Sequence, residues 1–137
     1  MFVFSGSRIR PTLATIDLGA IQHNLGVVRR LAPGVAVCAI VKADGYGHGA
    51  VPVSRALEKA GVDWLGVALV EEGIELRQAG VRTPIVVLFG GDGAQGKGYE
   101  QLLSYNLTPT LWRPDQLESY GHAAKDGRAP FHLKIDT

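Results

Sequence analysis

Short apolar runs at regular intervals constrain the fold of this chain more than any other feature. They are bounded by glycine, proline or charged residues and cover residues 35–41, 64–69, 84–89, 108–112 and 131–136. Runs of this length and composition predict β-strands. Successive runs begin 20 to 29 residues apart, which is enough chain for a strand, a loop and a helix. The pattern therefore predicts an α/β fold with a parallel sheet.

Amphipathic segments separate the apolar runs and predict helices over residues 50–60, 71–79, 99–105 and 115–125. An earlier helix is predicted over residues 18–31, where apolar side chains recur at helical spacing. Asp17 precedes this helix and is placed to cap its N-terminus. Residues 12–16 predict another short strand.

Two architectures fit this alternation. One is an open doubly wound sheet, which five strands complete. The other is a (β/α)8 barrel, which typically takes about 250 residues, so that 137 residues would supply about five βα units of an incomplete barrel. No linker or second-domain boundary interrupts residues 1–137.

Charge and cysteine content limit the partners and the compartment. The 14 basic and 13 acidic residues give a net charge of +1, which argues against nucleic acid or a membrane surface as a partner and favours a small molecule. The one cysteine, Cys38, cannot form an internal disulfide, and its apolar neighbours predict a small buried side chain. The first residues contain too short an apolar run for a signal peptide or a membrane span. We expect a cytoplasmic protein.

The densest chemical signal is Lys42, which ends a β-branched run and is followed by a glycine-rich segment reaching Gly49. In parallel α/β folds ligands bind beyond the carboxyl ends of the strands, so a lysine at this position can reach a cofactor from a rigid backbone. A partly desolvated amine there is suited to nucleophilic or Schiff-base chemistry. The glycines permit positive φ, and the next helix offers its N-terminal N–H groups to an anion.

The run VKADGYGHG, residues 41–49, resembles the cofactor-attachment motif of alanine racemases, which are fold-type III enzymes dependent on pyridoxal 5′-phosphate. The resemblance implies that Lys42 binds the cofactor covalently and serves as one of two racemisation bases. It also implies that Tyr46 contacts the cofactor phosphate. Weaker similarity extends over residues 11–137 and implies the N-terminal part of a (β/α)8 barrel, with a C-terminal β domain outside this sequence.

The segment FHLKIDT, residues 131–137, also resembles the family. Independently of the family, Phe131, Leu133 and Ile135 alternate with polar residues, which predicts a strand with one apolar and one polar face. The polar face fits either a site inside a barrel or the wet side of an edge strand. By the resemblance, Lys134 is a lysine that can be carbamylated and that supports an arginine at the cofactor ring.

The resemblance further implies interconversion of L- and D-alanine, which supplies D-alanine for the bacterial cell wall, by a homodimer in which a partner tyrosine is the second base. We expect little activity from these 137 residues alone. A substrate range that includes serine stays open, as does the choice between a natural truncation and a part of a longer reading frame.

Two other functions remain as alternatives. The first is a non-catalytic barrel module that binds pyridoxal 5′-phosphate. The second is a nucleotide-binding α/β domain that uses residues 91–97, because the segment from Gly91 to Lys97 fits two glycine-rich phosphate-loop patterns. Residue 98 is glycine rather than the Ser or Thr that binds Mg²⁺ in such loops, so we expect a surface loop instead.

The remaining histidines predict no metal site. His23 and His122 lie in predicted helices without a second ligand at metal-binding spacing. His48 belongs to the glycine-rich segment, where a supporting or helix-capping role is the stronger prediction.

Overall fold

The computed structural model describes residues 13–89, 91, 97–125 and 127–135, which form a five-stranded parallel sheet with six helices. The strands are β1 (Cys38–Ile40), β2 (Trp64–Val67), β3 (Ile85–Val87), β4 (Thr108–Leu111) and β5 (His132–Leu133). The helices are α1 (Leu18–Leu31), α2 (Lys42–Gly47), α3 (Ala50–Lys59), α4 (Val70–Gln78), α5 (Lys97–Ser104) and α6 (Pro114–Ala123). The predicted alternation of strands and helices is confirmed.

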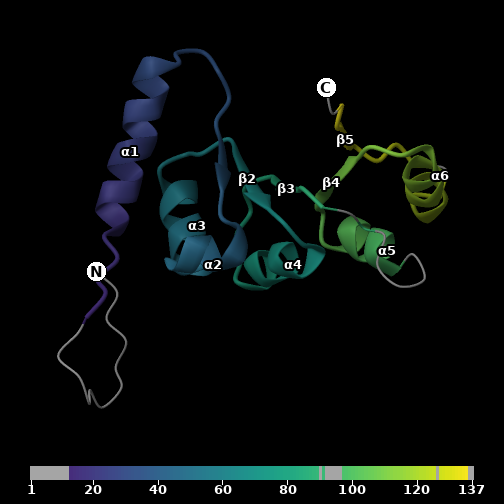
Figure 1. The fold of residues 1–137 in the computed structure, drawn as a ribbon, viewed down its shortest axis with the longest axis horizontal. Helices are drawn as coiled ribbons and strands as arrows, with labels where there is room; N and C mark the ends of the chain where they lie inside the picture. Colours follow the sequence, from purple (N-terminus) through teal and green to yellow (C-terminus); the bar gives the residue numbers. More distant parts are fainter. Residues whose placement is uncertain (1–12, 90, 92–96, 126, 136–137) are drawn as a thin grey trace.

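The strands lie in chain order, each parallel to its neighbours (Figure 1). Helices α3, α4 and α5 follow one side of the curved sheet, and its opposite side is open (Figure 1). This order, with every crossover on the same side, is that of successive units of a (β/α)8 barrel rather than of a doubly wound sheet, whose helices cover both faces.

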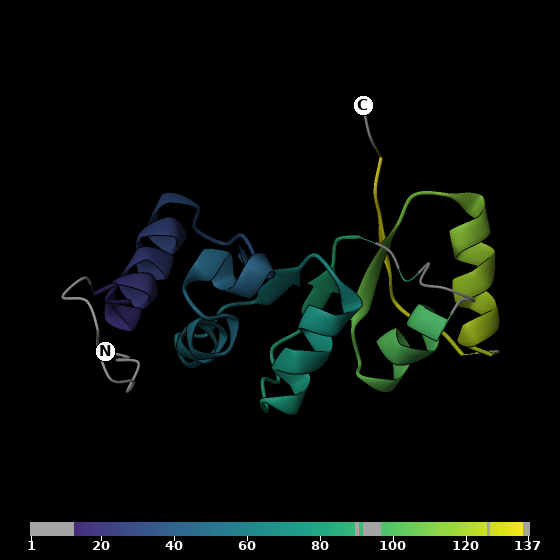
Figure 2. The same ribbon diagram turned by 60° about the horizontal axis from the view of Figure 1, so that its bottom comes forward.

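The helix-covered face of the sheet holds the core. Side chains alternate between the two faces along each strand, and those that face the helices are almost fully buried. They include Leu65, Val67, Ile85, Val87 and Leu111. Figure 2 shows the helices from below, packed in sequence along this face. Burial of these side chains accounts for every second position of the apolar runs, and Ile40, Trp64 and Val86 on the opposite face are also apolar, so the runs are continuous.

The open face carries a different set of side chains. The register pairs Cys38 with Trp64 and Ile40 with Gly66. The ring of His132 on β5 lies 5.3 Å from that of Trp64, edge to face, so the sheet curls strongly enough for β2 and β5 to meet across this face. The prediction that Cys38 is buried is wrong: its side chain is exposed because it belongs to the open face, not to the helix-covered one.

Helix α1 begins as predicted. The Asp17 carboxylate accepts hydrogen bonds from the N–H groups of Gly19 and Ala20, at 2.9 and 3.1 Å. Only part of its apolar stripe is covered, since Leu25 is buried whereas Leu31 is 80% exposed. No helix among the described residues is both long and apolar enough to cross a membrane.

Both ends of the described chain contain less strand than predicted. Residue 12 lies outside the described residues, and within 13–16 only Ile16 forms a single bridge, because a strand needs a neighbour along its whole length. The predicted strand over residues 131–136 is reduced to His132–Leu133, and Asp136 is not described. Leu133 and Ile135, from the predicted apolar face, are 66% and 74% exposed because no described helix covers them.

A left-handed turn follows β1. Ala43, Asp44, Gly45 and Tyr46 have φ values of 50°, 52°, 62° and 54°, within the segment labelled α2. Residues other than glycine seldom adopt this conformation, and four in succession are held only by surrounding contacts. One such contact is the Asp44 carboxylate, which accepts a 2.7 Å hydrogen bond from the N–H of Ala50 at the start of α3.

Polar side chains fix the loops at the amino ends of the strands. Glu58 accepts hydrogen bonds from the N–H groups of Arg82 and Thr83 and from the Thr83 hydroxyl, all within 2.9 Å. Arg77 donates to the carbonyl oxygens of Val81 and Thr83. Burial alone raises the pKa of Glu58, but these hydrogen bonds and the nearby Arg77 charge bring the pKa below its ordinary value.

The lowered pKa of Glu58 predicts a pH-dependent contribution to stability. A carboxyl that binds its proton more weakly in the folded state stabilises that state above the unfolded pKa, about 4.3, and the contribution is lost as the pH falls through the folded pKa. We expect Glu58→Gln to lower the free energy of unfolding at pH 7 by about 1–2 kcal/mol. In urea titrations the difference from wild type should shrink below about pH 4. A difference that stays constant down to pH 3 would contradict this role.

Asp44 gives a second stability prediction. Asp44→Ala removes the acceptor for the Ala50 N–H and places alanine at positive φ, so we expect a loss of about 1–2 kcal/mol in the free energy of unfolding. Asp44→Asn keeps an acceptor oxygen and a side chain that tolerates this conformation, and it should lose less than half as much. Equal losses for the two variants would show that the turn does not depend on this hydrogen bond.

Candidate functional site

Lys42 follows β1 at the carboxyl end of the sheet, directly before the left-handed turn. Its residue is half-buried, and the last ladder bond before it runs from the Val41 N–H to the Gly66 carbonyl at 2.8 Å. Among the described residues its Nζ atom has no hydrogen bond or ion pair. The atom lies over the ring of Phe89, 6.0 Å from the ring centroid. The structure thus presents an unpaired primary amine at the edge where ligands of parallel sheets bind.

Phe89 lies two residues after β3 and places its ring beside this amine. Its N–H donates to the Ala68 carbonyl at 3.0 Å, which joins the segments that follow β2 and β3. The ring is 55% exposed, so it forms an apolar wall that is still open to a ligand. Sequence analysis identified Phe89 only as the end of a strand, because nothing in the sequence pairs it with Lys42.

Glu72 is the second residue that sequence analysis did not assign to the site. It lies in the first turn of α4, and its carboxylate accepts three backbone hydrogen bonds. The donors are the N–H groups of Ala43 at 2.6 Å, Ala68 at 2.7 Å and Leu69 at 3.0 Å. The available signal was a glutamate three residues into a helix, a capping pattern that explains the Leu69 bond but not the bond to Ala43.

The turn directs Tyr46 outward. This side chain is 58% exposed, four residues beyond Lys42 on the same turn. His48 ends the turn, with its Nδ1 atom 2.9 Å from the Gly45 carbonyl and 3.1 Å from the Tyr46 carbonyl. This is the capping role predicted for His48, and it helps to hold the turn closed.

The first N–H of α3 is not free for an anion. The sequence predicted that the helix after the turn offers its N–H groups to a ligand, but the Asp44 carboxylate already occupies the Ala50 N–H. Gly45, Gly47 and Gly49 all have positive φ, as predicted.

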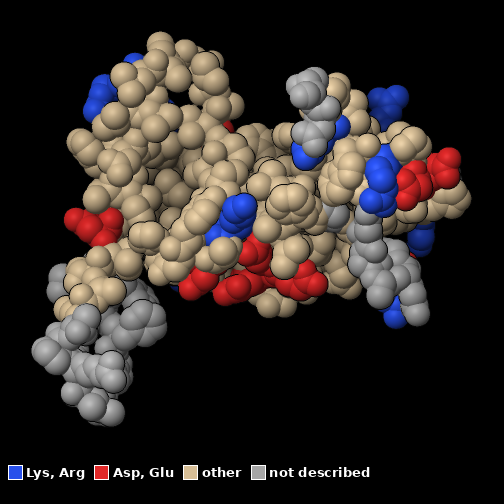
Figure 3. Space-filling model, viewed as in Figure 1, with Lys and Arg blue, Asp and Glu red and all other residues tan. Residues whose placement is uncertain are grey.

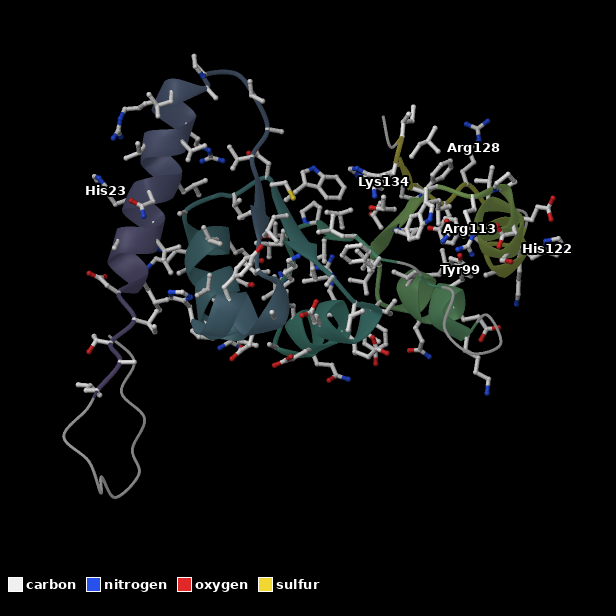
Figure 4. The ribbon with its side chains drawn as sticks, in the orientation of Figure 1. His23, Tyr99, Arg113, His122, Arg128 and Lys134 are labelled. Atoms are coloured by element: carbon white, nitrogen blue, oxygen red, sulfur yellow. The ribbon has the colours of Figure 1, made fainter. Side chains whose placement is uncertain are left out.

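Lys134 lies at the far end of the sheet order from Lys42. Its N–H donates to the Leu111 carbonyl at 2.9 Å, so its backbone continues the pairing of β5 with β4. Its side chain alternates onto the same face as His132, the open face, and Figure 4 shows it above the open side of the sheet. The predicted polar face of this segment therefore lies on the concave side.

The other polar residues singled out by sequence lie elsewhere. Figure 4 shows His23 on the outer side of α1 and His122 on the outer side of α6. His122 contacts the Glu118 carbonyl of its own helix at 2.9 Å. Within the described part of the chain, no three His, Cys, Asp or Glu side chains are grouped to hold a metal ion. Most of the segment between Gly91 and Lys97 falls outside the described residues.

The acidic surface lies mainly on the helix-covered side of the sheet (Figure 3). Figure 3 shows the red acidic surface gathered over α4, on the helix-covered side. Exposed Glu71 and Glu75 belong to that helix. The open side of the sheet in this view is mostly uncharged.

Comparison with known proteins agrees with this architecture. Residues 16–137 match the family described as alanine racemase, N-terminal domain. The chain is 42% identical over 135 residues to alanine racemase of Sorangium cellulosum and 43% identical over 131 residues to that of Symbiobacterium thermophilum. Each match covers 94% of this chain but only 36% and 34% of those proteins.

Solved structures give the same result. Alanine racemase of Clostridium difficile 630 superposes with a TM-score of 0.81 at 35% identity, over 93% of this chain and 34% of that one. Alanine racemase of E. faecalis superposes with a TM-score of 0.82 at 38% identity, over 100% of this chain and 36% of that one. The chain thus spans about a third of the length of its relatives, and the fold is the first part of their barrel domain. It belongs to the alanine racemase N-terminal domain family.

Proposed function

We propose that this chain binds pyridoxal 5′-phosphate covalently through Lys42 and supplies one half of an active site that interconverts L- and D-alanine. The observation that carries the proposal is the unpaired amine of Lys42, a half-buried residue at the carboxyl end of β1. Family membership indicates which cofactor and which substrate such an amine serves. By the same relationship the product is D-alanine for the cell wall, and the enzyme is a cytoplasmic homodimer.

The residues around Lys42 fit an aromatic, phosphorylated aldehyde. A primary amine without a carboxylate partner can bond covalently to a carbonyl carbon. The exposed Phe89 ring provides an apolar surface beside it. The exposed Tyr46 hydroxyl, on the same turn, is a donor suited to the cofactor phosphate. Lys134, on the open face, is proposed to be carbamylated and to support the arginine at the cofactor ring.

Lys42 then has two tasks. Its amine would hold the cofactor, and the same amine would take or return the proton at Cα on one face of the substrate. When bound, pyridoxal 5′-phosphate supplies an electron sink for the charge left at that carbon. The Phe89 ring lies on one side of this amine, with its centroid 6.0 Å from Nζ.

Covalent labelling tests the proposal. The purified chain is mixed with pyridoxal 5′-phosphate, reduced with borohydride, digested, and analysed by mass spectrometry for pyridoxyl groups. We expect Lys42 to carry most of the label at low cofactor concentration, because it is the lysine held in a preformed site. Lys42→Arg, which keeps the charge but cannot react, should remove this label and leave the others unchanged.

Exposed Lys59 provides the matched control. Lys59→Arg should leave the label at Lys42 at the wild-type level, since Lys59 ends α3 away from the turn. Label spread evenly over the lysines of the wild-type chain would overturn the assignment of Lys42.

We propose further that these 137 residues alone have little or no racemase activity. Racemisation needs an acid or base on each face of the substrate carbon, and Lys42 serves one face. The family resemblance places the other on a tyrosine of the C-terminal β domain of a partner subunit, outside residues 16–137 that match the family. A coupled assay for conversion of L-alanine to D-alanine should give a rate near background, and an enzyme-like rate would refute the need for that tyrosine. Strong labelling of Lys42 without turnover would fit a non-catalytic cofactor-binding module equally well.

A further inference from the structure

We infer that Glu72 is the residue that positions Lys42 for cofactor attachment, by a hydrogen bond from its carboxylate to the backbone directly after the lysine. This inference rests on the proposed function, because it concerns how the Lys42 amine is presented. Glu72 does not touch the amine itself. It acts through the Ala43 N–H, which it accepts at 2.6 Å.

The hydrogen bond between Ala43 and Glu72 lies just beyond the last backbone hydrogen bond between β1 and β2. The ladder between β1 and β2 ends with the bond from Val41 to Gly66, and the next residues enter the left-handed turn. Glu72 bridges the two segments that follow: one carboxylate oxygen accepts from Ala43 after β1, and the other accepts from Ala68 after β2. The carboxylate therefore extends the pairing by one further link.

The same carboxylate also fixes the aromatic wall. Ala68 donates its N–H to Glu72 and accepts, through its carbonyl, the N–H of Phe89. The Phe89 ring in turn lies beside the Lys42 amine. A continuous series of contacts thus joins the backbone after Lys42 to Glu72, Glu72 to Ala68, Ala68 to Phe89, and the Phe89 ring to the Lys42 amine. Glu72 is thus hydrogen-bonded to the backbone after Lys42 and is linked through Ala68 to the residue whose ring lies beside the Lys42 amine.

The three hydrogen bonds to Glu72 require its ionised carboxylate. A carboxylate offers only acceptors and can receive all three N–H groups. In Glu72→Gln one oxygen becomes an NH2 donor, which cannot face another N–H. The remaining amide oxygen can still accept from Ala68 and Leu69, since glutamine serves at this helix position as glutamate does. The substitution should therefore break the bond to Ala43 while the start of α4 stays formed.

The neighbouring Glu75 gives a matched control. It lies on the same helix, is exposed, and makes no side-chain interaction among the described residues. Glu75→Gln changes the charge of α4 by the same amount as Glu72→Gln. Any effect of overall charge on binding the anionic cofactor will appear in both variants.

The experiment compares wild type, Glu72→Gln and Glu75→Gln by borohydride labelling, with the label at Lys42 divided by that at Lys59 in the same sample. We expect Glu72→Gln to lower this ratio by at least about tenfold, the effect of losing a hydrogen bond to a charged group. Glu75→Gln should keep the wild-type ratio. Amide hydrogen exchange should be faster at Ala43 in Glu72→Gln and unchanged at Leu65 in the sheet.

Each other outcome has one meaning. A wild-type ratio in Glu72→Gln overturns the inference and leaves the proposed function intact. Faster amide hydrogen exchange at both Ala43 and Leu65 in Glu72→Gln also overturns the inference, because Glu72 would then support the whole fold. An equal fall in both variants assigns the effect to charge and overturns the inference. No preference for Lys42 in wild type is failure of the proposed function itself, and the inference falls with it.

Discussion

Five successive residues with positive φ after β1, residues 43–47, determine where the Lys42 amine can lie. The left-handed turn is followed directly by α3, which begins at Ala50. Ala43, Asp44 and Tyr46 do not favour this conformation on their own. Three side chains hold it: Asp44 within the turn, His48 at its end, and Glu72 from α4.

The parallel sheet provides the rigid frame for that turn. Buried branched side chains such as Leu65 and Ile85 fix β2 and β3 against the helices, so the ends of these strands are stable positions for Glu72 and Phe89. Glu58 and Arg77 fasten the loops at the opposite ends. Stability determinants thus gather at the amino ends of the strands and the candidate chemistry at the carboxyl ends, as in (β/α)8 barrels generally.

Most of the architecture could be predicted from the sequence, because short apolar runs indicate buried strands and apolar residues at a spacing of about 3.6 indicate helices. The position of Lys42 at the carboxyl end of β1 could be predicted from its place after an apolar run and before glycines. Cys38 could not, since an apolar run does not reveal which of its alternating side chains faces a covered side. Glu72 and Phe89 were missed because their contacts with residues 42 and 43 join distant parts of the chain. The positive φ of Ala43 is likewise imposed by tertiary contacts that no local residue type signals.

A crystal structure of the chain grown with pyridoxal 5′-phosphate tests the central claim most directly, that the turn after β1 presents the Lys42 amine to the cofactor. The account predicts electron density continuous from Lys42 Nζ to the cofactor, with residues 43–46 left-handed and the Glu72 carboxylate on the Ala43 N–H. Cofactor bound at another lysine, or a right-handed helix over residues 43–46, would contradict it.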